Sequence, residues 1–195
     1  NQNFTTSTNA RNTAVGDAAL NQSSSGTDNS ALGAFAGYAN TTGNTNTSMG
    51  SYALFTNQAG DRNTAVGHQA LKVMNPSGNV DTYNTAVGYD AGVSVTTGTG
   101  NTFLGGLAGD GTDDGIENVA VGYLALSANC GNANVAVGQA ALEACTSTNN
   151  TAVGHDAGKA VVGGANNTLI GNTAGYNIAT GDNNIFLGYN VSGSG

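Results

Sequence analysis

Asn12-Thr13-Ala14-Val15-Gly16 is the stretch that decides the fold, because it occurs with small changes eleven times along the 195-residue chain. The glycines that close the copies are Gly16, Gly33, Gly50, Gly67, Gly88, Gly105, Gly122, Gly138, Gly154, Gly171 and Gly188. Their successive spacings are 17, 17, 17, 21, 17, 17, 16, 16, 17 and 17 residues. Such a short and steady period is typical of a solenoid, in which each repeat packs on its neighbours.

Four positions of the repeat keep a constant chemistry. The residue four before the glycine is always Asn, and the next is Thr, Ser, Val or Ile, which suits the start of a strand. The residue directly before the glycine is always a sizeable apolar one, and we assign it to the core. The residue three after the glycine is Ala in ten copies and Val191 in the last, which indicates close packing.

The glycine is predicted to form a corner of each coil. The residue directly after it varies and is mostly polar, whereas the residue directly before it is always apolar. On one straight strand these two side chains would share a face, because side chains alternate with period two. A bend at glycine, which tolerates positive φ, separates them. We therefore predict two short strands and two turns in each coil.

The strand before the glycine is apolar on both faces. Two residues before the glycine stands Ala in seven copies, Ser48 in one, and Phe103, Leu169 or Phe186 in the other three. One face can fill the interior of the coil, but the other needs a cover. Because nearly all of the chain is spent on identical coils, partner chains are predicted to supply that cover.

The repeat resembles two families. Asn29-Ser30-Ala31-Leu32-Gly33, Asn118-Val119-Ala120-Val121-Gly122 and Asn134-Val135-Ala136-Val137-Gly138 resemble the YadA-like head repeat of trimeric autotransporter adhesins. Asn84-Thr85-Ala86-Val87-Gly88-Tyr89 resembles repeats of phage tail fibres. The resemblance covers residues 11–192, although the coils are two or three residues longer than the usual adhesin repeat.

The resemblance implies an all-β, left-handed parallel β-roll of about eleven coils of 16–17 residues, intertwined as a homotrimer. It also implies an extracellular adhesive rod on a bacterial surface or a virion tail fibre, with a host receptor or glycan as partner. A rod of this kind would be the head or the shaft of the fibre.

The repeat is predicted to form one domain over residues 11–192, with a partial coil at 1–10 and a linker at 193–195. The single 21-residue spacing places a longer loop at 72–83, which contains the only proline of the chain. An insertion in a solenoid leaves the coil as a loop, and loops on rigid scaffolds often carry binding residues. A turn without function is the alternative.

Five residues are candidate receptor contacts. Tyr89, Tyr123 and Tyr189 directly follow corner glycines, and Asn75 and Pro76 lie in the longer loop. A tyrosine offers an apolar ring with a polar end, which suits contact with sugars or proteins. The alternative is that these rings cover neighbouring turns.

Cys130 and Cys145 occupy nearly equivalent places on adjacent coils. Stacked coils place equivalent Cα atoms about 4.8 Å apart, which is within the usual range for a disulfide. A disulfide between adjacent coils is predicted, and a pair of buried thiols is the alternative.

The loop that contains Asp110, Asp113, Asp114 and Glu117 is the candidate Ca²⁺ site, since Ca²⁺ prefers several oxygen ligands on a tight turn. A solvated acidic turn is the alternative. No other cofactor is expected, because His68 and His155 lie five coils apart and are interpreted as surface side chains.

The charge and hydropathy of the sequence disfavour two classes of partner, nucleic acid and the membrane interior. Twelve acidic and four basic residues give a net charge of −8, which disfavours nucleic acid as a partner. No run of 18 apolar residues occurs in the sequence, so this segment is not expected to insert into a membrane. Apolar residues at fixed intervals also argue against disorder.

Two functions remain open. The first is the attachment fibre, and the second is an ice-binding or other surface-ordering solenoid. Six hydroxyl residues on successive coils support the second function, namely Thr13, Ser30, Thr47, Thr64, Thr85 and Thr102. A glycan hydrolase of the tailspike type is less favoured, because nothing in the spacing selects a pair of carboxylates, and the chain is predicted not to be an enzyme.

Overall fold

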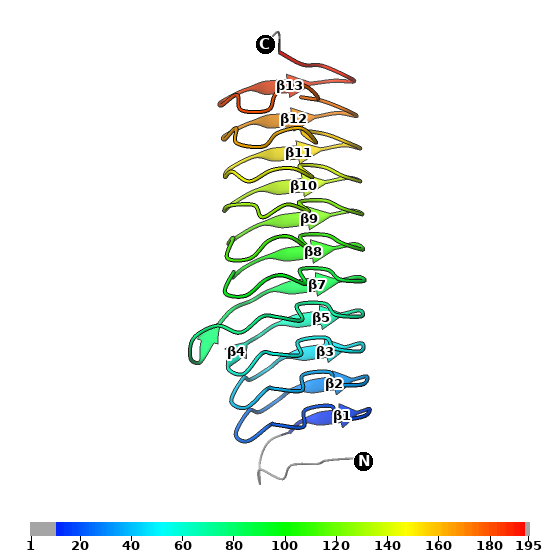
Figure 1. Ribbon diagram of the computed structural model, residues 1–195, viewed down its shortest axis with the longest axis vertical. Coiled ribbons are helices and arrows are strands. Elements are labelled where there is room, and N and C mark those ends of the chain that lie inside the picture. The colour runs from blue at the N-terminus through cyan, green and yellow to red at the C-terminus, as the bar shows by residue number, and fades with distance from the viewer. Residues whose placement is uncertain (1–10, 194–195) are drawn as a thin grey trace.

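The computed structural model describes residues 11–193, which form a rod of stacked coils (Figure 1). Each turn of the rod contributes one three-residue strand to a parallel sheet of eleven strands. These strands are β1 (Thr13–Val15), β2 (Ser30–Leu32), β3 (Thr47–Met49), β5 (Thr64–Val66), β7 (Thr85–Val87), β8 (Thr102–Leu104), β9 (Val119–Val121), β10 (Val135–Val137), β11 (Thr151–Val153), β12 (Thr168–Ile170) and β13 (Ile185–Leu187). No helix occurs in residues 11–193, which confirms the prediction of an all-β parallel solenoid, here of about ten turns.

The strands pair in strict register, so equivalent residues of successive copies lie directly above one another. Thr13 pairs with Ser30, for example, and Val135 pairs with Thr151. The 21-residue spacing does not disturb this order, because β5 pairs with β7 through equivalent residues. Every side-chain position therefore forms a row along the rod.

The corner glycines are required by geometry, as predicted. They have φ between +130° and +144°, a region that L residues rarely adopt. A Cβ atom at Gly50 would lie 2.3 Å from the carbonyl oxygen of Gly67 on the next coil. The coils therefore stack so closely at this corner that only glycine fits.

The predicted second strand is wrong. After the glycine the chain forms a turn in which alternate residues adopt left-handed backbone, such as Ala140 (φ 52°) and Leu142 (φ 51°). This alternation curls the backbone, so it cannot extend into a strand. The alanine three after the glycine nevertheless points inward, and Ala141 is fully buried.

The assignment of the residue directly before the glycine to the core is also wrong. In a three-residue strand only the middle side chain points into the narrow coil. The inward positions include Ala120 and Phe103, which are fully buried. Val15 is 54% exposed and Leu104 is 47% exposed, because this row faces outward. Val121 belongs to the same outward row and is half-buried.

A ladder of asparagines lines the interior beside the strands. The side-chain oxygen of Asn118 accepts a hydrogen bond of 2.9 Å from the backbone N–H of Asn134 on the next coil. Its side-chain nitrogen donates to the carbonyl oxygen of Gly131 at 2.8 Å, and its own N–H donates to Asn101. The same pattern recurs through most copies of the repeat, so the invariant asparagine satisfies backbone groups that the coil leaves buried.

The longer loop projects from the side of the rod (Figure 1). It carries β6 (Val80–Asp81), which pairs with β4 (Gly60–Asp61) as a second, two-stranded sheet. Arg62 forms an ion pair with Asp81 and lies over the ring of Tyr83, 5.5 Å from its centroid. The hydroxyl group of Tyr83 donates a hydrogen bond of 3.1 Å to Asp81 within the loop. The two contacts of Arg62 hold the loop against the preceding coil.

The predicted partial coil at 1–10 lies outside the described residues, as do the last two residues of the predicted linker. The described chain ends at residue 193, where the two-residue turn after Gly188 gives way to irregular backbone.

Candidate functional site

The outer face of the eleven-stranded sheet is the candidate site, and two rows of side chains form it. The strands present their first and third residues outward, because the middle residue points into the coil. The first row is Thr13, Ser30, Thr47, Thr64, Thr85, Thr102, Val119, Val135, Thr151, Thr168 and Ile185. The second row, called here the aliphatic row, is Val15, Leu32, Met49, Val66, Val87, Leu104, Val121, Val137, Val153, Ile170 and Leu187.

The aliphatic row faces outward along the whole rod. Its side chains range from half-buried to 72% exposed at Leu187. At the N-terminal end of the sheet, Val15, Leu32 and Met49 line a shallow apolar hollow. Neither row contains a charged residue. Contiguous apolar surface of this kind marks interaction sites on soluble proteins.

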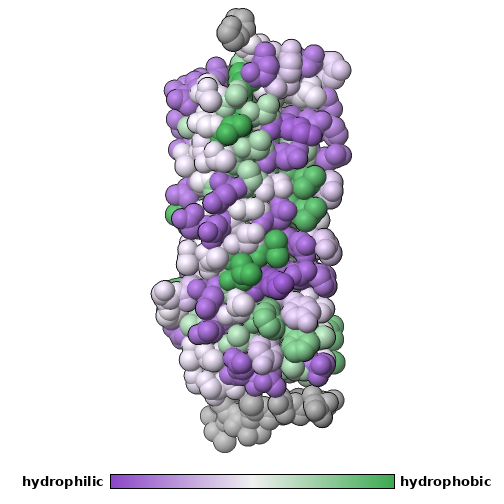
Figure 2. Space-filling view, in the orientation of Figure 1, coloured by the Kyte–Doolittle hydropathy of each residue, from purple (hydrophilic) through white to green (hydrophobic). Residues whose placement is uncertain are grey.

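The side of the rod that faces the viewer in the orientation of Figure 1 has a mixed surface. Apolar side chains are scattered there among polar ones (Figure 2).

The three predicted tyrosine contacts are exposed. Tyr89 and Tyr123 are more than half exposed, and Tyr189 is 79% exposed. Tyr89 also stacks on His68 of the preceding coil, with 5.4 Å between ring centroids and an interplanar angle of 6°. One of the three rings therefore covers its neighbour on one side and remains open elsewhere.

The two predicted contacts in the longer loop differ. Asn75 is exposed, and its side-chain oxygen accepts a hydrogen bond from the backbone N–H of Gln58. Pro76 is buried beside Gly60, where a Cβ atom would lie 3.0 Å from the proline ring. The prediction of Pro76 as a receptor contact is therefore wrong, because the loop folds back and uses the proline as packing.

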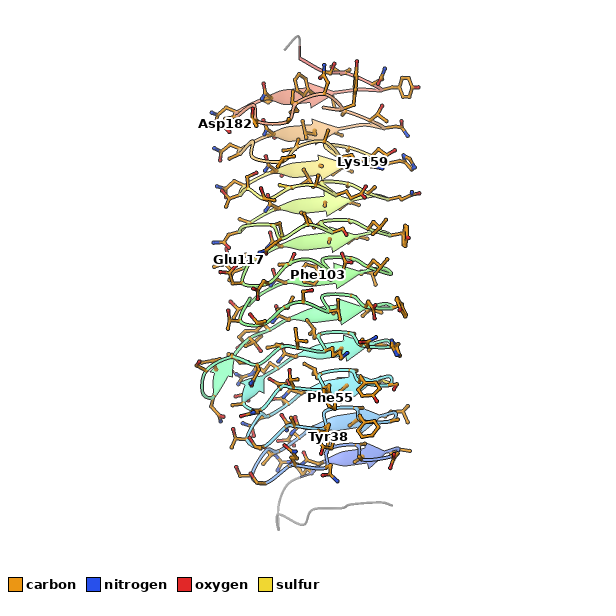
Figure 3. All side chains as sticks on the ribbon, viewed as in Figure 1. Tyr38, Phe55, Phe103, Glu117, Lys159 and Asp182 are labelled. Atoms are coloured by element: carbon orange, nitrogen blue, oxygen red, sulfur yellow. The ribbon has the colours of Figure 1, made fainter. Side chains whose placement is uncertain are left out.

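An aromatic cluster on two adjacent coils was not predicted. Phe35 stacks on Tyr52 at 5.1 Å and Tyr38 stacks on Phe55 at 5.2 Å, measured between ring centroids. Tyr38 and Phe55 lie in the N-terminal part of the rod (Figure 3). The rings occupy the positions two and five after Gly33 and Gly50, a coincidence that aligning the repeats would have revealed. Since the rings stack on one another, the stacked ring faces contact other rings of the cluster.

The acidic loop does not gather its carboxylates. Asp110 accepts a hydrogen bond of 2.6 Å from Ser127, and Asp113 accepts one from Thr96. Partial burial raises the pKa of the Asp110 carboxyl, and the charge of Asp90 acts in the same direction, although the Ser127 hydrogen bond opposes them. Within residues 11–193, no three His, Cys, Asp or Glu side chains are grouped to hold a metal ion.

Both cysteines are free thiols in the structure, so the predicted disulfide is not formed there. Cys130 and Cys145 are buried in the core of the rod. The sulfur of Cys130 lies 3.1 Å from the hydroxyl oxygen of Thr112, and that of Cys145 lies 3.4 Å from the hydroxyl oxygen of Ser147. Burial raises the pKa of the Cys130 thiol to about 11, which keeps it protonated and unreactive.

The two histidines lie on the surface beside carboxylates. Nδ1 of His68 is 3.6 Å from Asp90, and Nδ1 of His155 is 3.1 Å from Asp156. Lys159 bridges Asp156 and Glu143 on the adjacent coil at 3.3 and 3.1 Å.

No protein-family model matches the chain, and no curated protein or solved structure shows significant similarity to it. Among the described residues there is also no helix with the length and hydropathy needed to cross a membrane. The surfaces of the rod are therefore the features that bear on function.

Proposed function

We propose that this chain is a structural and adhesive segment of an attachment fibre, in which three copies cover the outer faces of their long sheets. The observation that carries the proposal is the aliphatic row, which is uncharged and faces outward from β1 to β13. Burial of such a row against another copy removes apolar surface from water and favours association.

The rest of the rod suits a fibre that displays or spaces a contact surface. Each coil fills its own interior, and the asparagine ladder fixes each coil on the next. Eleven strands spaced about 4.8 Å apart give a rod about 50 Å long. The proposal includes the left-handed β-roll and the extracellular location on a bacterial surface or virion, which rest on the resemblance of the repeat. It also includes the absence of catalysis, which rests on the lack of a catalytic grouping in the sequence.

The first test is the solution mass of the chain, measured by light scattering after size exclusion. We expect a mass near three times 19.1 kDa. Leu104→Asp places a charge in the aliphatic row, and we expect it to lower the mass toward that of one chain while the circular dichroism spectrum is retained.

Val162→Asp is the matched control, because Val162 is similarly exposed (45%) but lies outside the long sheet. It is expected to keep the mass of the unmodified protein. A folded monomer for the unmodified chain, or equal behaviour of the two variants, would refute the trimer.

A second candidate function is binding to ice or another ordered surface. It is favoured by the first outward row, where six successive copies carry Thr or Ser beside the aliphatic row. Val119, Val135 and Ile185 interrupt the hydroxyl groups. This function needs a face that no partner covers, so it requires a folded monomer that produces thermal hysteresis in ice growth.

A further inference from the structure

The side chains directly after the corner glycines form a row along one edge of the rod, and one coil of this row has no side chain. The residues in this position include His68, Tyr89, Gly106 and Tyr123 on four successive coils. The N–H of Leu107 donates to the carbonyl oxygen of Tyr89 at 2.9 Å, which sets the coil of Gly106 directly on the coil of Tyr89. We call the space above Gly106 the Gly106 gap.

Gly106 could carry a side chain without a clash, and its backbone is ordinary. A Cβ atom at Gly106 would meet nothing closer than a ring carbon of Tyr123 at 3.8 Å and the carbonyl oxygen of Tyr89 at 4.0 Å. Unlike the corner glycines, Gly106 does not have a positive φ. Neither space nor backbone therefore demands glycine here, although both demand it at the neighbouring Gly105.

The ring of Tyr89 turns one face into the gap. His68 lies on the coil before Tyr89 and stacks nearly parallel to it, so one face of the Tyr89 ring is turned toward the preceding coil. The opposite ring face is then directed toward the next coil, which is that of Gly106. The exposure of Tyr89 (57%) agrees with one face that is open. Tyr123, on the coil beyond, forms the other wall.

We propose that the Gly106 gap binds one neutral hexopyranose unit of a surface glycan, stacked on the open face of Tyr89. This inference rests on the proposed attachment function and names the class of its ligand. Tyr89 and Tyr123 lie two coils apart, which separates their backbones by about 9.6 Å. That span leaves room between the walls for a puckered sugar ring, whose C–H groups pack on an aromatic face and whose hydroxyl groups reach water or the phenol groups.

The charge around the gap selects a neutral sugar. Asp90 directly follows Tyr89, and the charge of Asp90 is felt at Asp110 on the next coil. The whole chain carries a net charge of −8. A sugar with a carboxylate would meet repulsion here, since like charges disfavour each other at short range.

The test uses saturation-transfer NMR on the full chain with the methyl glycosides of glucose, galactose and mannose as probes. We expect at least one of them to receive magnetisation from tyrosine ring protons. Gly106→Tyr should abolish the transfer because it fills the gap, and Tyr89→Ala should weaken binding about tenfold through loss of one stacking contact.

Tyr176→Ala is the control, because Tyr176 is similarly exposed (47%) but lies outside the row that directly follows the corner glycines. It should leave binding unchanged. Circular dichroism and the melting temperature of each variant show that the rod is intact, as the open geometry at Gly106 predicts.

The inference is overturned if none of the three glycosides binds, if Gly106→Tyr binds as well as the unmodified chain, or if glucuronate binds more tightly than glucose. A trimer without sugar binding refutes this inference alone. Sugar binding by a monomer refutes the trimeric fibre and leaves the Gly106 gap as a sugar site.

Discussion

At the scale of the residue, the invariant asparagine has the clearest role. Asn118 is fully buried and takes part in hydrogen bonds with the coils on both sides. Its importance follows from an asymmetry of hydrogen bonding. A hydrogen bond contributes little when it merely replaces one to water, but a buried group that loses its partner costs much more.

Asn118→Ala is therefore expected to destabilise the protein strongly. The substitution leaves the N–H of Asn134 without its acceptor and removes the shorter of the two side-chain hydrogen bonds to the carbonyl oxygen of Gly131, which should cost about 2 to 4 kcal/mol. Asn172→Ala is the control, because Asn172 is exposed, and its effect should stay within about 0.5 kcal/mol. Urea unfolding measures both values, and equal effects would contradict a structural role for the ladder.

At the same scale, the sequence shows which positions are constrained but not all of the reasons. The invariant asparagine, the corner glycine and the small alanine were identified from the repeats. The apolar residue before the glycine was placed inside, because a three-residue strand is too short for its alternation to show in the sequence. The position of the asparagine shows which strand residue points inward. The asparagine and the middle strand residue are two positions apart in the sequence, so their side chains share the inner face.

At the scale of the element, each coil is one strand followed by a turn with alternating left-handed residues. The turn was predicted as a strand, since the sequence gives no sign that Leu and Ala would adopt positive φ at fixed places. This backbone is normally disfavoured for such residues. It persists here because the stacked neighbours accept its hydrogen bonds, as when Leu142 N–H donates to Ala157 at 2.9 Å.

The small sheet of β4 and β6 should open locally while the long sheet of the rod stays intact. Asp81→Ala removes the ion pair with Arg62 and the acceptor for Tyr83, both at the surface. Surface ion pairs contribute up to about 1 kcal/mol, so hydrogen exchange at the N–H of Thr82 should become several-fold faster. The N–H of Gly88, which bonds to Val66 within the long sheet, should not change.

Asp114→Ala provides the comparison for this prediction, because it removes an exposed carboxylate from a different coil. Exchange at Thr82 should be unaffected by it. If Asp81→Ala also accelerates exchange at Gly88, the loop and the rod open together, and the loop is not an independent element.

At the scale of the whole molecule, the rod has one main core cluster, a smaller cluster near its N-terminal end (Ala19, Leu20, Ala31 and Ala36), and one uncharged outer sheet face. The core cluster extends from Ala53 to Ala174, and buried side chains of neighbouring coils touch throughout it. The periodic sequence was sufficient to predict the solenoid and the unsatisfied apolar surface. The Gly106 gap and the aromatic cluster arise from positions that vary between copies, so they are found only by comparing individual copies and not from the consensus of the repeat.

The buried thiol gives the whole rod a dependence on alkaline pH. The pKa of Cys130 is raised to about 11 in the folded chain from 9.0, because burial disfavours the thiolate. The unfolded chain therefore loses this proton first as the pH rises. We expect the stability contributed by this thiol to be complete below pH 9 and to fall between pH 9 and about 11.

The measurement is the free energy of urea unfolding at several pH values, for the unmodified protein and for Cys130→Ala. The substitution lowers the stability at neutral pH but should make the alkaline decline shallower, because other groups alone then titrate. An identical decline in both proteins would show that Cys130 is not the group responsible.

The hydrogen bonds between coils, such as that from Gly105 N–H to Val87, point along the axis of the rod. A force applied along the axis at the two ends therefore breaks the hydrogen bonds of one coil at a time. The terminal coil should unfold first, and each coil of 17 residues that unfolds would add about 60 Å of extended chain. Under tension, a single chain would therefore lengthen in steps, one coil at a time. In an assembly, the contacts between copies would decide how much force the rod withstands.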